Sequence, residues 1–169
     1  MKNVILTGFM GTGKSTVGHI LARRLGLRYA DLDALIVDRA GLSINDIFAR
    51  YGEPHFRALE TEVIRGVVSH EGAVLSTGGG AVISPVNREL LHAAGVVINL
   101  YATVDEICER LRDDCERPLL KDGRPQERVS AMMAEREPFY ADADLRIDTT
   151  GKTVEDVVAE IIEFLGIVG

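Results

Sequence analysis

Residues 8–15 read Gly-Phe-Met-Gly-Thr-Gly-Lys-Ser and follow directly on the apolar residues 4–6. This stretch fits the pattern G-x-x-x-x-G-K-[ST], whose glycines let backbone N–H groups curl around a phosphate. Lys14 can reach the terminal phosphates, and the Ser15 hydroxyl can ligate Mg²⁺. A helical pattern begins at once with Val17, and its positive end points at the same place. The stretch therefore predicts a strand, a phosphate-binding loop and a helix, with a nucleoside triphosphate as ligand.

The bulk composition is that of an ordinary soluble globular protein. The 169 residues are 46% hydrophobic and 27% charged, which favours one domain with a real core. No apolar run is long enough to span a bilayer, and the first strand begins too early to leave room for a signal peptide, so we expect a cytoplasmic protein. The net charge is −7 with no basic stripe, which argues against nucleic acid as a partner.

Strand and helix patterns alternate along the chain. We expect strands at 2–7, 28–32, 73–77, 96–101 and 144–148. We expect helices at 15–25, 33–40, 44–51, 55–70, 85–94, 104–113, 125–136 and 154–165. The strand patterns are apolar nearly throughout, as a sheet covered on both faces requires, and the alternation predicts a doubly wound parallel α/β fold. Residues 113–125 break the rhythm with many charges, two prolines and a glycine, and this composition indicates a mobile loop.

Candidate chemistry follows two of the other predicted strands, at the edge where parallel α/β sheets bind ligands. Asp31 and Asp33 are separated by one residue, so their side chains would lie on the same face if the strand continued. One carboxylate could then support the Mg²⁺ ion, and the other could accept a proton from an attacking hydroxyl. The alternative is that the pair caps the helix beginning at Ala34. Residues 78–80 are three glycines, which allow a ligand close approach or simply form a loose turn.

Three arginines are candidates for binding anions. Arg57 and Glu60 lie three residues apart on one predicted helix face, so Glu60 can hold the guanidinium in place to receive a carboxylate. Arg117 lies in the predicted mobile loop, from which it could close over phosphates. Arg136 stands near a predicted helix end, and its alternative is a surface cation interacting with the helix dipole.

The motifs together, in the order phosphate loop, D-x-D, F-R-x-x-E, G-G-G, R-P-L and R-x-x-x-Y, resemble those of shikimate kinases from Asn3 to about Lys152. The resemblance implies a single P-loop domain over 1–169 with a nucleoside-monophosphate-kinase-like fold. Its three α/β/α layers would hold a five-stranded parallel sheet in the order 2-3-1-4-5. A mobile lid would lie at about 113–125 and a shikimate-binding helical region at about 33–60. The implied reaction transfers the γ-phosphoryl group of ATP to the 3-hydroxyl of shikimate, on the pathway to chorismate and aromatic amino acids.

The resemblance also implies roles for residues on the nucleotide side. The implied ATP contacts are Gly11, Thr12, Gly13, Lys14, Ser15, Thr16, Arg117 and Lys152. Lys14 and Arg117 would also be catalytic, because they place positive charge around the transferring phosphate. Mg²⁺ would be held by Ser15 directly and by Asp31 through water.

The implied substrate side is built from four residues. Asp33 would bind the shikimate hydroxyls and act as the catalytic base. Arg57 and Arg136 would clamp the carboxylate, and Gly79 would donate its backbone N–H. We expect a monomer whose partner is the small molecule shikimate.

Three alternative functions are each compatible with part of the sequence. Another small-molecule kinase, such as a gluconate kinase, shares the loop and the general fold but not the combination of D-x-D, F-R-x-x-E and G-G-G. A GTP-dependent switch would carry N-K-x-D, yet none of the four lysines follows an asparagine. A relative that had lost activity would normally show damage at Lys14, Asp33, Arg57 or Arg136, and all four are present.

Overall fold

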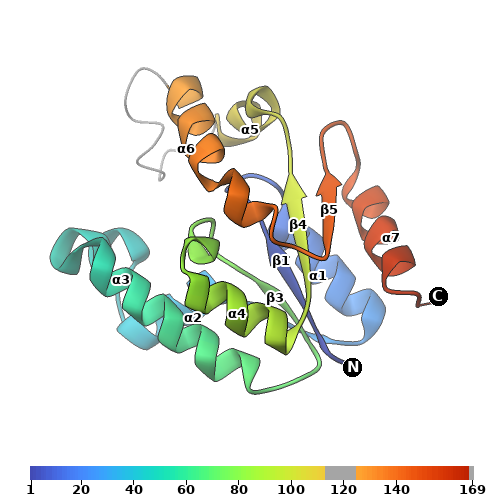
Figure 1. The fold of residues 1–169 in the computed structure, drawn as a ribbon, viewed down its shortest axis with the longest axis horizontal. Helices are drawn as coiled ribbons and strands as arrows, with labels where there is room; N and C mark the ends of the chain where they lie inside the picture. Colours follow the sequence, from blue (N-terminus) through green and yellow to red (C-terminus); the bar gives the residue numbers. More distant parts are fainter. Residues whose placement is uncertain (113–124, 168–169) are drawn as a thin grey trace.

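Five parallel strands form one sheet at the centre of the molecule (Figure 1). The structure is a computed structural model and describes residues 1–112 and 125–167. The strands are β1 (Asn3–Thr7), β2 (Arg28–Asp31), β3 (Ala73–Ser76), β4 (Gly95–Tyr101) and β5 (Leu145–Asp148). They lie in the order β2-β3-β1-β4-β5, all paired in parallel, which confirms the predicted fold.

Helices cover both faces of the sheet (Figure 1). On one face lie α1 (Lys14–Leu25) and α7 (Val154–Phe164), and on the other α2 (Leu32–Ala40), α3 (Ile44–Val68) and α4 (Pro85–Ala94). Alternation along β1 divides the core, since Val4 and Leu6 pack with α1 and α7 while Ile5 packs with the other group. Burying each such side chain contributes about 1.5–3 kcal/mol relative to leaving it exposed.

Two further helices and a short 3-10 turn lie beyond the carboxyl ends of the strands. These are α5 (Val104–Leu111), α6 (Pro125–Tyr140) and η1 (Ala81–Ile83) (Figure 1). A third apolar cluster joins them to the phosphate loop and contains Phe9, Val82, Ile107, Val129 and Tyr140. This cluster holds α6 above the edge of the sheet where ligands of parallel α/β proteins bind.

Several boundaries differ from those predicted. Strand β2 ends at Asp31, one residue early, and α6 runs on to Tyr140 instead of ending at 136. The predicted helices 44–51 and 55–70 form one element, α3, with a non-helical Gly52 (φ 82°) at the break. The 3-10 turn η1 was not predicted.

Nearly all of the predicted lid at 113–125, with Arg117, lies outside the described residues. In the described ranges, no helix combines the length and apolar character needed to cross a membrane.

Candidate active site

The phosphate loop connects β1 to α1 and presents backbone N–H groups. Gly11 (φ 79°) and Gly13 (φ 91°) lie in the left-handed region that favours glycine. Within the part of the chain that the structure describes, no side chain caps the start of α1, so its first N–H groups remain available to an anion. The Lys14 ammonium donates to the carbonyl oxygens of Gly8 (2.7 Å) and Phe9 (3.0 Å), so it is held over the loop.

Asp31 serves two purposes at the end of β2. Its Oδ1 accepts a hydrogen bond from the Ala34 N–H (3.1 Å), so it is the N-cap of α2. Its Oδ2 accepts a hydrogen bond from the Ser15 hydroxyl (3.4 Å). The strand does not continue to Asp33, because the chain turns into α2 at Leu32, so the two carboxylates do not share a strand face. The capping alternative is confirmed for Asp31.

The Ser15 hydroxyl and the Asp31 carboxylate supply oxygen donors, which Mg²⁺ prefers. Across residues 1–112 and 125–167, no group of three or more His, Cys, Asp or Glu side chains could hold a metal ion. The pair fits a magnesium ion that takes its remaining ligands from water and nucleotide phosphates rather than from a protein cage.

The three glycines at residues 78–80 form the contact point for the predicted substrate-side residues. A hypothetical Cβ on Gly78 would stand 2.6 Å from Asp33 Oδ1. One on the second glycine would stand 3.4 Å from Arg136 Nη1, and one on the third would collide with the Arg57 guanidinium. A side chain at any of these three positions would therefore press on the Asp33 carboxylate or on one of the two guanidinium groups.

The same tip adjoins the phosphate loop. A hypothetical Cβ on Gly79 would stand 3.6 Å from the Met10 backbone nitrogen. The Arg136 guanidinium lies 5.7 Å from the centre of the Phe9 ring, and the Phe9 carbonyl accepts a hydrogen bond from Lys14. The structure thus brings Arg136, the glycine tip and Lys14 together on the carboxyl side of the sheet.

Glu60 holds Arg57 in the manner that the sequence predicts. Arg57 Nη1 lies 3.0 Å from Glu60 Oε1, and the Glu60 side chain is buried. Burial raises the pKa of the Glu60 carboxyl, and the charge of Arg57 opposes that shift. Arg57 Nε also lies 3.4 Å from the exposed Glu53. The two carboxylates fix the orientation of the guanidinium at the glycine tip.

Arg110 is a residue at the site that the sequence analysis missed. Its Nη1 donates to the carbonyl oxygen of Gly11 (3.0 Å) and its Nη2 to that of Thr149 (3.2 Å). It therefore fastens the loop after β5 to the phosphate loop. The only sequence signal was its i,i+4 spacing from Glu106, with which it forms an ion pair (3.1 Å).

Lys152, the predicted ATP contact, lies in that same loop after β5. Its ammonium donates to Glu160 Oε1 on α7 (2.6 Å), and this partner raises the pKa of Lys152. Exposed pairs of this kind are weak, so the lysine can exchange its partner for a phosphate.

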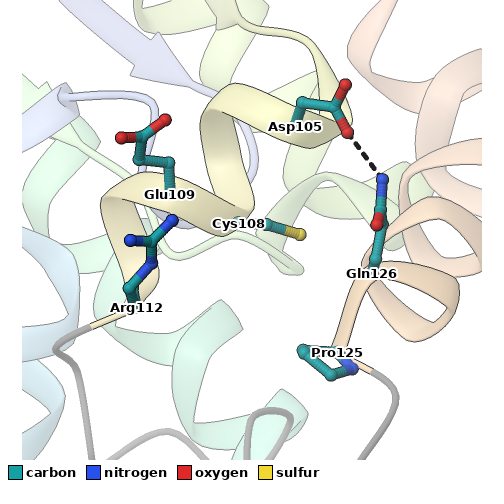
Figure 2. Close-up of a pocket in the computed structure, with 6 residues that line it drawn as sticks. All are labelled: Asp105, Cys108, Glu109, Arg112, Pro125 and Gln126. Atoms are coloured by element: carbon teal, nitrogen blue, oxygen red, sulfur yellow. Dashed lines mark hydrogen bonds between the residues drawn. The ribbon is translucent and has the colours of Figure 1, made fainter.

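A hollow of about 470 Å³ lies between α5 and α6 (Figure 2). It is lined by Asp105, Cys108, Glu109, Arg112, Pro125 and Gln126. Gln126 closes one side by donating to Asp105 Oδ1 (2.6 Å) (Figure 2). Burial raises the pKa of the Cys108 thiol, which keeps it protonated and unreactive. None of the predicted site residues within 1–112 and 125–167 lines this hollow.

The doubly wound parallel sheet, the phosphate loop and a cluster of an aspartate with two arginines define a small-molecule kinase of the P-loop class. A family model described as shikimate kinase matches residues 10–166. The chain belongs to the shikimate kinase family, and it is an ATP-dependent kinase.

Individual relatives agree over almost the whole chain. The shikimate kinase of Geobacter metallireducens is 72% identical over 165 residues, which cover 98% of this chain and 92% of that protein. The shikimate kinase of Geobacter sulfurreducens is 63% identical over 164 residues, covering 97% and 91%. The solved structure of a shikimate kinase from Acinetobacter baumannii in complex with shikimate superimposes with a TM-score of 0.93 at 36% identity, covering 98% of this chain and 93% of that one.

Proposed function

We propose that the residues gathered at the tip of β3 carry out the transfer of the γ-phosphoryl group of ATP to the 3-hydroxyl of shikimate, giving shikimate 3-phosphate and ADP. The observation that carries this proposal is the meeting of Asp33, Arg57 and Arg136 at residues 78–80, beside the phosphate loop. Two guanidinium groups suit one carboxylate, and an aspartate beside them suits the hydroxyls of a cyclic acid.

On the nucleotide side, the N–H groups of residues 11–16 bind the phosphates and Lys14 turns from its own loop carbonyls to the γ-phosphate. Ser15 and Asp31 are the residues that would hold Mg²⁺, which neutralises charge on the phosphate oxygens when bound. Lys152 contacts the nucleotide from the loop that Arg110 fastens to the phosphate loop. Arg117 lies outside the described residues, and its contact with the transferring phosphate stays a prediction.

On the substrate side, Asp33 accepts the proton of the attacking hydroxyl. Phosphoryl transfer needs positioning and charge neutralisation more than covalent chemistry, and the proton leaves late, so an aspartate is a sufficient base. Gly79 donates its backbone N–H to the substrate between Arg57 and Arg136. The arrangement draws on regular elements, since α2 carries Asp33, α3 carries Arg57, α6 carries Arg136 and β3 leads into the glycine tip.

The proposal is tested by the release of ADP from Mg-ATP with shikimate, with gluconate and without an acceptor. We expect turnover with shikimate, and only background release in the other two arms. Faster ADP release with gluconate than with shikimate would instead identify a sugar acid as the substrate.

Shikimate methyl ester should be a poor substrate. Arg57 and Arg136 lose a charged partner when the carboxylate is esterified, and charge-assisted hydrogen bonds are about twice as strong as neutral ones. We expect the KM for the ester to exceed that for the acid by about tenfold or more, which corresponds to about 1.4 kcal/mol. Steady-state rates for both compounds at saturating ATP measure this, and equal use of ester and acid would exclude the clamp.

Gly78→Ala should lower kcat without unfolding the protein. The added Cβ would stand 2.6 Å from Asp33 Oδ1, so the carboxylate has to move. A displacement near 1 Å at a reacting group costs on the order of 10²-fold in rate. Gly66→Ala in α3 is the control, because a Cβ there meets nothing within 4 Å. A Gly78→Ala enzyme with the kcat of the control would show that the position of Asp33 is not critical.

A further inference from the structure

Tyr140 ends α6, one turn after Arg136, and its ring packs in the apolar cluster around Phe9. Only 4% of the residue is exposed, and its hydroxyl donates to the carbonyl oxygen of Gly79 at 2.6 Å. Burial raises the pKa of the Tyr140 phenol, while the neighbouring positive charge of Arg136 opposes the shift. A protonated phenol is a donor, so this hydrogen bond persists at neutral pH.

The carbonyl that accepts this hydrogen bond belongs to the central peptide of a tight turn. The Ala81 N–H donates to the Gly78 carbonyl (3.1 Å), which closes a four-residue turn over residues 78–81. Gly80 has φ −99° and ψ 2°, as the third residue of a type I turn requires. A type II turn differs by a flip of the central peptide and needs φ near +80° at that residue, which glycine adopts without steric cost.

The backbone preferences of Gly79 and Gly80 therefore do not by themselves fix the orientation of the peptide between them. Because a trans peptide is planar, its carbonyl and its N–H point in opposite directions. With the Gly79 carbonyl turned toward the buried Tyr140, the Gly80 N–H points away from that buried side. A flip would replace this donor by a carbonyl oxygen, which repels an anion, at the tip where Arg57 and Arg136 meet.

We propose that Tyr140 is a positioning residue for the acidic substrate. Its hydroxyl holds the peptide between Gly79 and Gly80 in the orientation that offers an N–H, and not a carbonyl oxygen, on the side away from Tyr140. This inference rests on the proposed function, because the substrate in question is shikimate. Tyr140 itself touches neither substrate in this assignment and acts through the backbone of the glycine tip.

The first test reads the turn in the protein without substrate. Residues 78–80 contain the only two Gly-Gly links in the sequence, so labelling with [1-¹³C,¹⁵N]glycine and selecting amides bonded to a labelled carbonyl isolates the N–H groups of Gly79 and Gly80. In Tyr140→Phe we expect the Gly79 carbonyl and Gly80 amide resonances to shift or broaden. Unchanged resonances would overturn this inference alone, since the measurement does not depend on turnover.

The second test separates positioning from stability. In Tyr140→Phe, loss of the hydrogen bond to the Gly79 carbonyl should weaken shikimate binding by about five- to tenfold. Both the Kd from calorimetry and the KM for shikimate should rise by this factor. The KM for ATP should stay within about twofold of the wild-type value, because the change lies on the acid side of the site. A lower melting temperature with an unchanged KM for shikimate would instead assign Tyr140 a purely structural role and overturn the proposal.

Tyr101→Phe is the matched control. It removes the same hydroxyl from a tyrosine that is 37% exposed at the end of β4, and it should change neither the glycine resonances nor either KM. If the wild-type protein did not bind shikimate, that result would contradict the proposed function itself. That result is distinguishable from the failure of the Tyr140 assignment, which the glycine resonances decide.

Should Tyr140→Phe fail to fold, 3,5-difluorotyrosine at position 140 keeps the ring and hydroxyl in place. Fluorination makes the phenol ionise at lower pH, and an ionised oxygen cannot donate to the Gly79 carbonyl. The charges around it, Arg136, Glu137 and Arg57, are unchanged. We expect the KM for shikimate to begin rising at a lower pH than in the wild type, and coincident pH profiles would contradict the proposal.

Discussion

Lys14→Met should abolish phosphoryl transfer while leaving the fold intact. The Lys14 ammonium lies over the phosphate loop on the carbonyls of Gly8 and Phe9, from which a bound triphosphate would draw it. Methionine keeps the unbranched shape of the side chain, one atom shorter, but cannot neutralise charge on the γ-phosphate. Removing a preorganised electrostatic contact of this kind costs about 10²–10³-fold in kcat, and a charged one at the transferring group costs more. Shikimate-dependent ADP release is the measurement.

Lys2→Met is the control for the loss of a lysine, because Lys2 is exposed and precedes β1. Both variants should melt near the wild-type temperature. If Lys14→Met turned over at a rate close to that of the control, the assignment of residues 8–15 as the phosphate loop would be refuted.

Asp33→Asn should lower kcat by about 10²-fold or more, since general-base catalysis contributes about 10²–10⁴-fold. Asparagine keeps the size of the side chain against Gly78 and its hydrogen-bonding capacity toward hydroxyls, but it cannot take up a proton. The effect should therefore fall more on kcat than on the KM for shikimate. Single-turnover rates of shikimate 3-phosphate formation separate the chemical step from product release.

Asp38→Asn is the matched control, because Asp38 lies on the exposed face of the same helix, α2. It should leave both constants unchanged. An Asp33→Asn enzyme that kept more than about a tenth of the wild-type kcat would remove Asp33 from the role of base, for which the expected loss is larger.

The fold was predictable because the hydrophobic patterns and the phosphate-loop motif indicate the same order of strands and helices. Apolar strand runs alternate with helical patterns, and the phosphate loop fixes where β1 ends and α1 begins. The parallel sheet then carries the ends of β1, β2 and β3 to one edge. This is why the sequence alone predicts that Asp31, Asp33 and residues 78–80 lie near the phosphate loop.

What the sequence did not predict depends on tertiary contacts. Proline at 138 favours a helix end, yet α6 continues to Tyr140, whose burial and hydrogen bond to the Gly79 carbonyl hold the last turn. Arg110 was missed because its partners are backbone carbonyls of Gly11 and Thr149, which leave no trace in residue identity. Asp33 could not be assigned to the strand or to the helix from sequence, because an aspartate suits both a strand end and a helix start, and the chain leaves β2 at Asp31 to begin α2 at Leu32.

The glycine tip at residues 78–80 has a consequence for protein engineering. Its three positions adjoin different groups, the carboxylate of Asp33, the guanidinium of Arg136 and that of Arg57. A mutagenesis library that varied this tip to broaden the acceptor range would impair the base or the clamp before it reshaped the cavity. Attempts to redirect the enzyme toward uncharged alcohols should leave the tip intact and vary the arginines instead.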